Sequence, residues 1–355
     1  MKQIDVGVRS RLASLARDQA RSFEQLGSPF YAVLFGSVAD DIEEGGPCAA
    51  LLAPYVDVPF GATLGTRLLG GVHRLVLEGE ADDLAKHYPS VDGDGDAGAA
   101  WPKFRELVAM RSEELEPYLQ RAPQTNEVGR SAALAVGFLR IAATTGRPLR
   151  LLEIGSSAGL NLRFDRYYYS DGDFSFGDPR SPVRFVDLWD GSIPDFDADC
   201  VVAERRGCDT NPVDPTAEDG RLTLLSYVWP DQRERFDMLR HALDVAQDFP
   251  AIVDRAEAAE WLERRLAERR DRATTVVFHS VVWGYLEESE QARVWELLDS
   301  AGAQATADAP LAWLRLEPTA YTEHAELWCT TWPGADERML ATSGFHLGRV
   351  NCMGS

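Results

Sequence analysis

The sequence predicts an α/β fold, in which an N-terminal helical domain precedes a mostly parallel sheet that ends in an antiparallel hairpin. Two patterns predict it. From Leu149 onward, short apolar runs alternate with stretches of helical period, which is typical of parallel strands joined by helical crossovers. Before Leu149, apolar residues recur mainly at helical spacing. We therefore expect a helical domain or cap at residues 1–123 and the sheet domain at 124–355, with an insertion at about residues 170–199.

The first domain contains several segments with a helical apolar period. In residues 8–26, apolar side chains recur at Leu12, Leu15 and Phe23, and Gly27 ends the pattern. Further helices are expected at 29–39, 49–54, 63–77 and 101–119. Between them, residues 89–100 carry alternating Asp and Gly but lack the glutamate that ends a twelve-residue calcium loop, so we expect a solvated loop there.

The sheet domain is expected to contain five strands and four crossover helices. The strands are predicted at 149–154, 200–205, 251–254, 274–282 and 311–316. The helices are predicted at about 158–168, 231–248, 256–269 and 289–301. A small extra strand is expected at 182–188 inside the insertion, and a terminal hairpin at 326–332 and 339–350.

Charge and cysteine content limit the partners. With 36 Lys and Arg against 57 Asp and Glu, the formal net charge is −21, which disfavours nucleic acids because their binding draws on clustered basic residues. The five cysteines form no C-x-x-C pair and no zinc spacing, so we expect no metal and a reducing cytoplasm. No apolar run approaches the roughly 18 residues of a membrane span, and no signal peptide is recognisable. We therefore expect a small-molecule substrate, no nucleic acid and no membrane; the oligomeric state stays open.

The turn after the first predicted strand carries most of the functional information. Glu153 lies near the end of the strand, and Gly155 and Gly159 follow with Ser157 between them, which gives E-x-G-x-x-x-G. A dinucleotide site needs G-x-G-x-x-G instead. The pattern resembles the first motif of class I S-adenosylmethionine-dependent methyltransferases, [D/E]-x-G-x-G-x-G, with Ser157 replacing the central glycine. The resemblance implies a Rossmann-like fold and S-adenosylmethionine as cofactor. The alternative is an ordinary turn whose glycines serve packing.

Ligand-facing groups of such a sheet follow the carboxyl ends of its strands. We expect Glu153 to accept from the cofactor's amino group, Asp209 to bind its ribose and Asp254 to contact its adenine. The alternatives are an Asx turn at Asp209 and a helix cap at Asp254. The expected cofactor residues are Glu153, Gly155, Ser156, Ser157, Gly159, Asn161, Asp209 and Asp254.

Catalytic and substrate-binding candidates flank these positions. His279 ends the fourth predicted strand and is the candidate general base, since an imidazole titrates near neutral pH. The alternative is a histidine of the core. The expected substrate-binding residues are Asn126, Glu127, Arg130, Trp283 and Tyr285. A helix cap with a surface ion pair is the alternative for Asn126, Glu127 and Arg130.

Several further stretches resemble one family over nearly the whole chain. They are residues 124–130 (QTNEVGR), 153–162 (EIGSSAGLNL), 206–209 (RGCD), 211–214 (NPVD), 228–231 (VWPD) and 278–280 (FHS). Together they resemble the bacterial family that carries domain of unknown function 2332. The resemblance supports a methyltransferase-like fold and implies no substrate.

Three functional hypotheses follow. The first is a cytoplasmic S-adenosylmethionine-dependent methyltransferase that methylates oxygen or nitrogen of a small molecule. The second is a non-catalytic protein on the same fold that binds S-adenosylmethionine or another ligand, because the side chain of Ser157 occupies the place of a glycine. The third is another cofactor-using enzyme on a doubly wound sheet. The chain has neither a nucleophile elbow G-x-S-x-G nor a P-loop, which disfavours an α/β-hydrolase and a nucleotide kinase.

Overall fold

The computed structural model describes residues 4–57, 64–192, 194–268, 272–319, 324–346 and 348–354. The chain divides into two compact units. One comprises the residues up to Thr125 together with Ala217–Asp237, and the other comprises Asn126–Thr216 and the residues from Met238 onward. The segment 217–237 thus returns to the helical unit, although the sequence pattern placed it between two elements of the sheet domain.

The first unit is helical. Its elements are α1 (Val6–Gln25), α2 (Pro29–Glu44), α3 (Pro47–Leu52), η1 (Ala53–Tyr55), α4 (Leu64–Leu77), α5 (Asp82–Ala85), η3 (Pro89–Val91), α6 (Ala97–Met110), α7 (Ser112–Leu119) and α9 (Glu218–Ser226). The helix expected at 101–119 is two helices, because Arg111 between them leaves helical geometry with φ −116° and ψ 25°. The expected loop at 89–100 is wrong at its end, where Asp96 caps α6 by accepting from the Ala99 N–H at 2.9 Å. Thr63, the expected start of α4, lies outside the described residues.

Aromatic packing explains why the segment 217–237 joins this unit. The ring of Phe23 makes edge contacts with Tyr31, Phe35 and Trp229, at centroid distances of 5.7, 5.8 and 5.1 Å. Trp229 therefore contributes to the core that α1 and α2 form. Arg74 of α4 adds polar contacts, since it pairs with Asp219 at 2.9 Å.

The second unit is built on a nine-stranded sheet. Its strands are β1 (Leu149–Ile154), β5 (Trp189–Gly191), β6 (Val202–Asp209), β7 (Ile252–Arg255), β8 (Thr274–Ser280), β9 (Leu311–Pro318), β10 (Ala325–Trp332), β11 (Asp336–Ser343) and β12 (Val350–Cys352). The order is β5-β12-β11-β10-β9-β8-β1-β6-β7. The five strands from β7 to β9 are parallel and have the order 3-2-1-4-5 of a doubly wound sheet. The predicted terminal hairpin is present as β10 and β11, which continue the sheet in antiparallel pairing.

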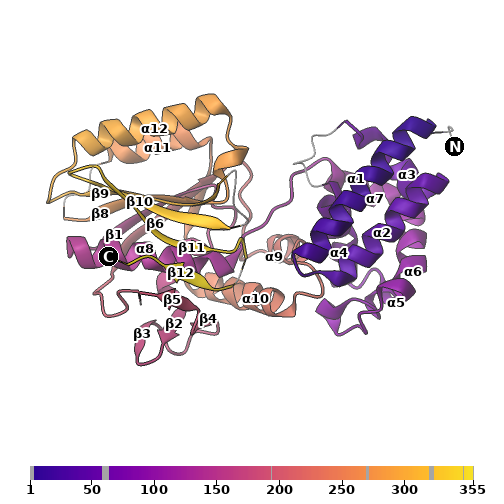
Figure 1. The fold of residues 1–355 in the computed structure, drawn as a ribbon, viewed down its shortest axis with the longest axis horizontal. Coiled ribbons are helices and arrows are strands. Elements are labelled where there is room, and N and C mark those ends of the chain that lie inside the picture. Colours follow the sequence, from indigo (N-terminus) through magenta and orange to yellow (C-terminus); the bar gives the residue numbers. More distant parts are fainter. Residues whose placement is uncertain are drawn as a thin grey trace. The chain divides into compact units, whose positions relative to one another are not determined.

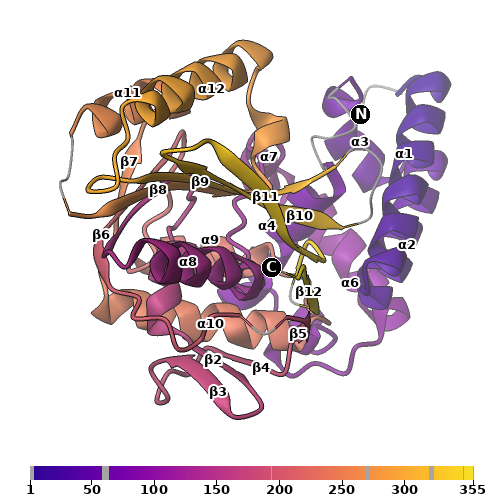
Figure 2. The same cartoon turned by 60° about the vertical axis from the view of Figure 1, so that its left-hand side comes forward.

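Helices cover both faces of this sheet, as Figures 1 and 2 show. On one face lie α11 (Ala258–Ala267) and α12 (Glu288–Ala303), over an apolar core that includes Leu152, Val277 and Trp313. On the other face lies α8 (Ser131–Thr145), whose Phe138 ring packs against Phe164 and Phe278. The division of the chain into two units falls within α10 (Arg233–Asp248), after Asp237. Arg269, the expected end of α11, lies outside the described residues.

The helix expected at 158–168 is wrong. In its place the chain forms a short 3₁₀ segment, η5 (Asn161–Arg166), which Arg163 interrupts with φ −103° and ψ 18°. A small sheet of order β3-β2-β4 follows, from β2 (Tyr168–Asp171), β3 (Phe174–Gly177) and β4 (Arg184–Val186), and β4 confirms the extra strand expected at 182–188. The aromatic run explains the change, because Tyr169 stacks on Phe185 across this sheet and aromatic residues favour a pleated surface.

Candidate functional site

The strand order reverses between β1 and β8, and ligands of doubly wound sheets bind beyond the carboxyl ends of the strands at this point. The loops that leave β1 and β8 carry unusual backbone geometry. Ser157 and Val281 have φ angles of 51° and 52°. A β-branched residue rarely adopts positive φ, and such strain concentrates at functional sites. Both loops at this reversal of strand order therefore hold a non-glycine residue at positive φ, a conformation that Asp92, Asp187, Arg272 and Ala335 adopt elsewhere in the chain.

The backbone N–H groups of the turn after β1 already donate hydrogen bonds within the chain. The Ser157 N–H donates to Asp209 Oδ2 at 2.8 Å, and the Leu160 N–H donates to Asn126 Oδ1 at 2.9 Å. The Gly159 N–H donates to the Ser156 carbonyl at 2.7 Å. We expected a helix N-terminus with open amides here, but η5 is short and these donors already have acceptors. The turn consequently lacks the ring of open amides with which phosphate-binding loops hold their ligands.

The two glycines of the turn are both required by the local backbone. Gly155 and Gly159 have φ angles of 67° and 68°, which favour glycine. A Cβ atom on Gly155 would lie 2.3 Å from Val282 Cγ2, and one on Gly159 would lie 3.0 Å from Val253 Cγ2. Side chains of this chain thus pack against both glycines, as the packing interpretation of the motif requires.

Glu153 is the most unusual group at this edge of the sheet. Its side chain is buried, with 2% of the residue exposed, and its Oε2 atom has no hydrogen-bond partner among the described residues. Burial raises the pKa of this carboxyl well above its usual range; Asp209 adds to the rise, and Arg163, Ser156 and Arg130 oppose it. A buried polar atom without a partner costs free energy, so it calls for an explanation such as a ligand.

Asn161 presents a second open atom near the same turn. It is buried, and its Oδ1 atom accepts a hydrogen bond from the Ser131 hydroxyl at 2.7 Å. Its Nδ2 atom has no partner among the described residues. The end of β1 and the start of η5 thus hold an open carboxyl oxygen and an open amide donor.

Asp209 lies on the same face of the sheet as Glu153. Arg205 identifies this face, because it is opposite Leu151 in register and binds Asp165 of η5 at 2.6 Å. Asp209 accepts from the Ser157 N–H through Oδ2 and from the Asn211 N–H through Oδ1, both at 2.8 Å. The Asx turn is therefore formed, and each oxygen keeps a lone pair for a further donor.

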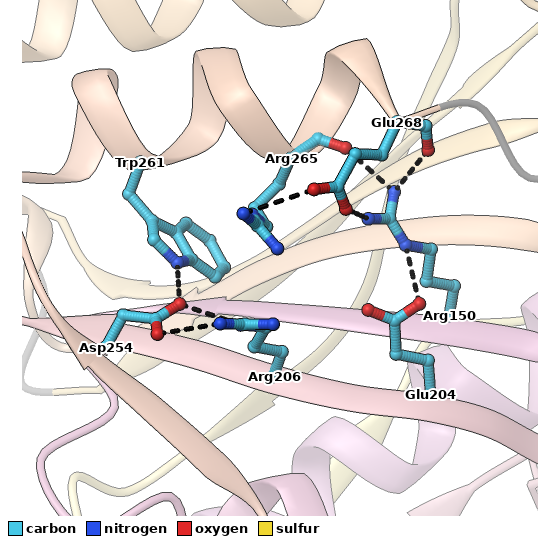
Figure 3. A network of polar contacts seen from close by, with 7 residues as sticks. All are labelled: Arg150, Glu204, Arg206, Asp254, Trp261, Arg265 and Glu268. Carbon is cyan, nitrogen blue, oxygen red and sulfur yellow. Dashed lines mark hydrogen bonds and ion pairs between the residues drawn. The ribbon is translucent and has the colours of Figure 1, made fainter.

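Asp254 lies on the other face, beneath α11, as Figure 3 shows. Its carboxylate accepts from Arg206 Nε and Nη2 at 2.7 and 2.8 Å and from Trp261 Nε1 at 2.7 Å. The hydrogen bond from Arg206 lowers the pKa of this carboxyl. Beside it, Arg150 binds Glu204 and Glu268 and two backbone carbonyls at the end of α11. These contacts attach α11 to the sheet, and they use both oxygens of Asp254.

His279 also lies on the α12 face. It is opposite Arg315 in register and next to the ring of Trp313, and it is fully buried. Its Nδ1 atom lies 2.6 Å from Glu317 Oε1, and its ring stacks on Trp283 at 5.0 Å. Glu317 also accepts from the N–H groups of residues 282 and 283 at 3.1 to 3.3 Å, so it holds the loop that follows β8. Tyr285, in contrast, is 75% exposed.

The segment 126–130 connects the loops at this end of the sheet. Asn126 binds the turn at Leu160, as described above. Arg130 donates through Nη1 to the carbonyl of Ser280 at 3.0 Å and through Nε to the carbonyl of Phe345 at 3.2 Å. Glu127 caps the next turn and lies 3.3 Å from His346 Nδ1. The segment therefore lies beside the turn, and Glu127 is its cap residue.

The structure thus separates the sequence candidates. The candidates that lie in or beside the turn after β1 are Glu153, Gly155, Ser156, Ser157, Gly159, Asn161, Asp209, Asn126, Glu127 and Arg130. Asp254, His279 and Trp283 lie on the opposite face of the sheet. Strand-end position could not distinguish these groups, because neighbouring residues of a strand point to opposite faces.

Sequence reasoning missed Ser131, Arg163, Glu317 and His346. Arg163 is buried and donates to the carbonyls of Ala158, Gly159 and Phe249. The only signal for it was a cation close behind the glycine turn. Glu317 and His346 come from distant elements, and no local motif marks them.

Two searches of the described part of the chain found nothing. No group of three or more His, Cys, Asp or Glu residues has a metal-binding arrangement there. Among the same residues, every helix is too short or too polar to span a bilayer.

The comparisons with known proteins give one match. The family described as "Uncharacterized protein conserved in bacteria (DUF2332)" matches residues 13–351. No curated protein and no solved structure matches the chain.

Proposed function

The chain belongs to the DUF2332 family, and we propose that it is an S-adenosylmethionine-dependent methyltransferase that acts on a small molecule. The open Oε2 atom of Glu153 carries the proposal. This buried carboxyl ends the central strand of a doubly wound sheet, where a cofactor would lie. An ammonium group would supply the missing partner, since charge-assisted hydrogen bonds are among the strongest in proteins.

The surrounding groups fit an amino-acid moiety joined to a nucleoside. Glu153 would bind the ammonium group, and the Asn161 amide would donate to the carboxylate. Asp209 has lone pairs left for ribose hydroxyls. The satisfied amides of the turn fit a cofactor without phosphates better than a dinucleotide. Asp254 is not part of this proposed site, because Arg206 and Trp261 use its carboxylate on the other face.

The bound cofactor would supply an electrophilic methyl group, and most of the acceleration would come from alignment of the acceptor. Arg130 and Asn126 would keep the loops around the acceptor fixed through their bonds to backbone groups. His346, oriented by Glu127, would take the acceptor's proton. We prefer His346 to His279 as the base because His346 is partly exposed, whereas His279 is closed in between Trp283 and Trp313.

One observation favours a second candidate, a protein that binds such a ligand without transferring a methyl group. Val282 packs against Gly155, in the space that a glycine opens for a cofactor. Under this candidate, Glu153 and Asn161 would recognise an amino acid or its derivative, and the loop after β8 would serve only as a wall.

Calorimetric titration of the full chain with S-adenosylmethionine and S-adenosylhomocysteine tests the proposal. We expect saturable binding of both, with about tenfold or greater weakening in Glu153→Gln, because an ammonium loses its charged acceptor. If neither compound binds at millimolar concentration, the cofactor assignment is overturned.

A matched variant distinguishes the charge of Glu153 from a general effect. Glu204→Gln removes an acid from β6, where it pairs with Arg150, and should leave the affinity unchanged. If both glutamine variants weaken binding equally, Glu153 does not bind the ammonium group. Binding without methyl transfer to a panel of small alcohols, amines and acids would favour the second candidate.

A further inference from the structure

A cavity of about 470 Å³ lies in the sheet unit, at the amino ends of β8 and β9. Its position is at the opposite end of the parallel strands from the turn after β1. The walls come from the last turns of α8, from β9 and from the hairpin of β10 and β11, and Met353 lies at its margin. Cavities of this size hold small molecules in other proteins.

The floor of the cavity is apolar. Ile141, Leu311, Ala312, Cys329 and Leu340 line it. Of these residues, Ile141, Leu311, Ala312 and Cys329 are buried. The floor suits the apolar body of a ligand.

Three threonines of the cavity already use their hydroxyl protons. Thr144 and Thr145 donate their hydroxyl protons to the carbonyls of Arg140 and Ile141, at 2.7 and 2.8 Å. Thr274 donates to the hydroxyl of Thr145 at 3.0 Å. Because their hydroxyl protons are used, these threonines offer the cavity mainly methyl groups and oxygen lone pairs.

Two arginines supply the donors instead. Arg140 pairs through Nε with Asp195 at 2.8 Å, and Arg338 pairs through Nε with Asp336 at 2.8 Å. A guanidinium group has five N–H donors in a planar fork that matches a carboxylate, so each arginine keeps donors beyond its ion pair. Both arginines line the cavity.

We infer that this cavity is a second binding site, whose ligand is a small amphipathic carboxylic acid. The apolar body would fill the floor between α8 and β9, and the carboxylate would lie between Arg140 and Arg338. This inference is independent of the proposed methyltransferase activity, because the cavity and the turn after β1 share no residue.

Calorimetric titration of the full chain with decanoate tests the inference. The probes 1-decanol and decylammonium have the same apolar chain and test the role of the negative charge. We expect decanoate to bind at one site per chain, and to bind at least tenfold more tightly than the alcohol or the amine. In the double variant Arg140→Gln/Arg338→Gln, the affinity for decanoate should fall to that of the alcohol. Arg293→Gln, which removes an arginine outside the cavity that pairs with Glu263, should change nothing.

A cavity-filling variant tests the location. Thr331→Phe places a ring in the cavity from a partly exposed position and should abolish decanoate binding. If that variant fails to fold, the arginine pair decides the question, since Arg338 is exposed and Arg140 is partly exposed. Equal affinity for the acid and the alcohol, or no saturable binding, would overturn the inference. Glu153→Gln should leave decanoate binding unchanged, which keeps this result separate from that of the proposed cofactor site.

Discussion

Two carboxylates near strand ends, Asp254 and Glu153, are held in different ways on the two faces of the nine-stranded sheet. On the α11 face, Arg206 and Asp254 meet in two hydrogen bonds, and Trp261 adds a third. On the α8 face, Glu153 is buried with an oxygen that no described group satisfies, and Asn161 has an open donor. The difference teaches that position at a strand end does not identify a binding group. A buried polar atom that its own fold leaves open, such as Glu153 Oε2, Asn161 Nδ2 or, on the α12 face, His279 Nε2, is the better indicator.

The largest expected effect on stability comes from Gly155, in the turn after β1. Gly155→Val adds a β-branched side chain at positive φ and overlaps Val282, so we expect a loss of about 4 kcal/mol in the free energy of unfolding. Chemical denaturation measures it. Gly146→Val has a similar φ of 60° but no neighbour within 4 Å, and should lose only about 1–2 kcal/mol.

The same position tests whether packing alone explains the glycine. In Gly155→Ala, removal of the overlapping group by Val282→Ala should restore part of the lost stability, because the two side chains compete for one space. Strictly additive losses in the double variant would contradict this packing. Binding of S-adenosylmethionine by the rescued variant would then show whether the space also admits a cofactor.

The second effect concerns the Arg206–Asp254 pair on the α11 face. Arg206→Ala leaves Asp254 with Trp261 as its remaining side-chain donor, and we expect a loss of about 2 kcal/mol. Replacing both partners, as in Arg206→Met/Asp254→Leu, should cost less than the single change, because no unpaired charge remains. A thermal or denaturant double-variant cycle measures the coupling. A cycle with no coupling would show that the Arg206–Asp254 pair does not stabilise the pairing of β6 with β7.

Much of the sheet could be predicted from the sequence, because β1, β8 and β9 are largely apolar runs and crossovers separate the parallel strands. The strand at 149–154 has the same bounds in the structure. The helix at 158–168 could not be predicted correctly, since its pattern does not reveal that the tyrosines pair in a separate small sheet. The return of residues 217–237 to the helical unit depends on the contact of Trp229 with Phe23, which no local period encodes.

For the site, the sequence identified the turn but not the direction of its neighbours. Glu153 and Asp209 were correctly grouped with the turn, because both lie at the ends of adjacent central strands. Asp254 and His279 were grouped with them by the same argument, although they point to the other face. Glu317 lies at the end of β9, beside His279, and His346 lies in the loop after β11, beside Glu127, so only the folded chain brings these partners together.

The smallest expected effect is also the one that most sharpens the comparison. Burial raises the folded-state pKa of Glu153, so the native state binds more protons than the unfolded state between the ordinary glutamate pKa and the raised one. The contribution of Glu153 to stability is therefore fully present in acid and is lost as the pH rises. Glu153→Gln should match the wild type below about pH 4 and should be more stable than it at pH 7 to 8. Denaturation at a series of pH values measures this difference, and Glu204→Gln, whose acid has a partner in Arg150, provides the control. A glutamine variant that is less stable at neutral pH would mean that a partner within the chain satisfies the Glu153 carboxylate. The α8 face would then bury its charge in the same way as the α11 face.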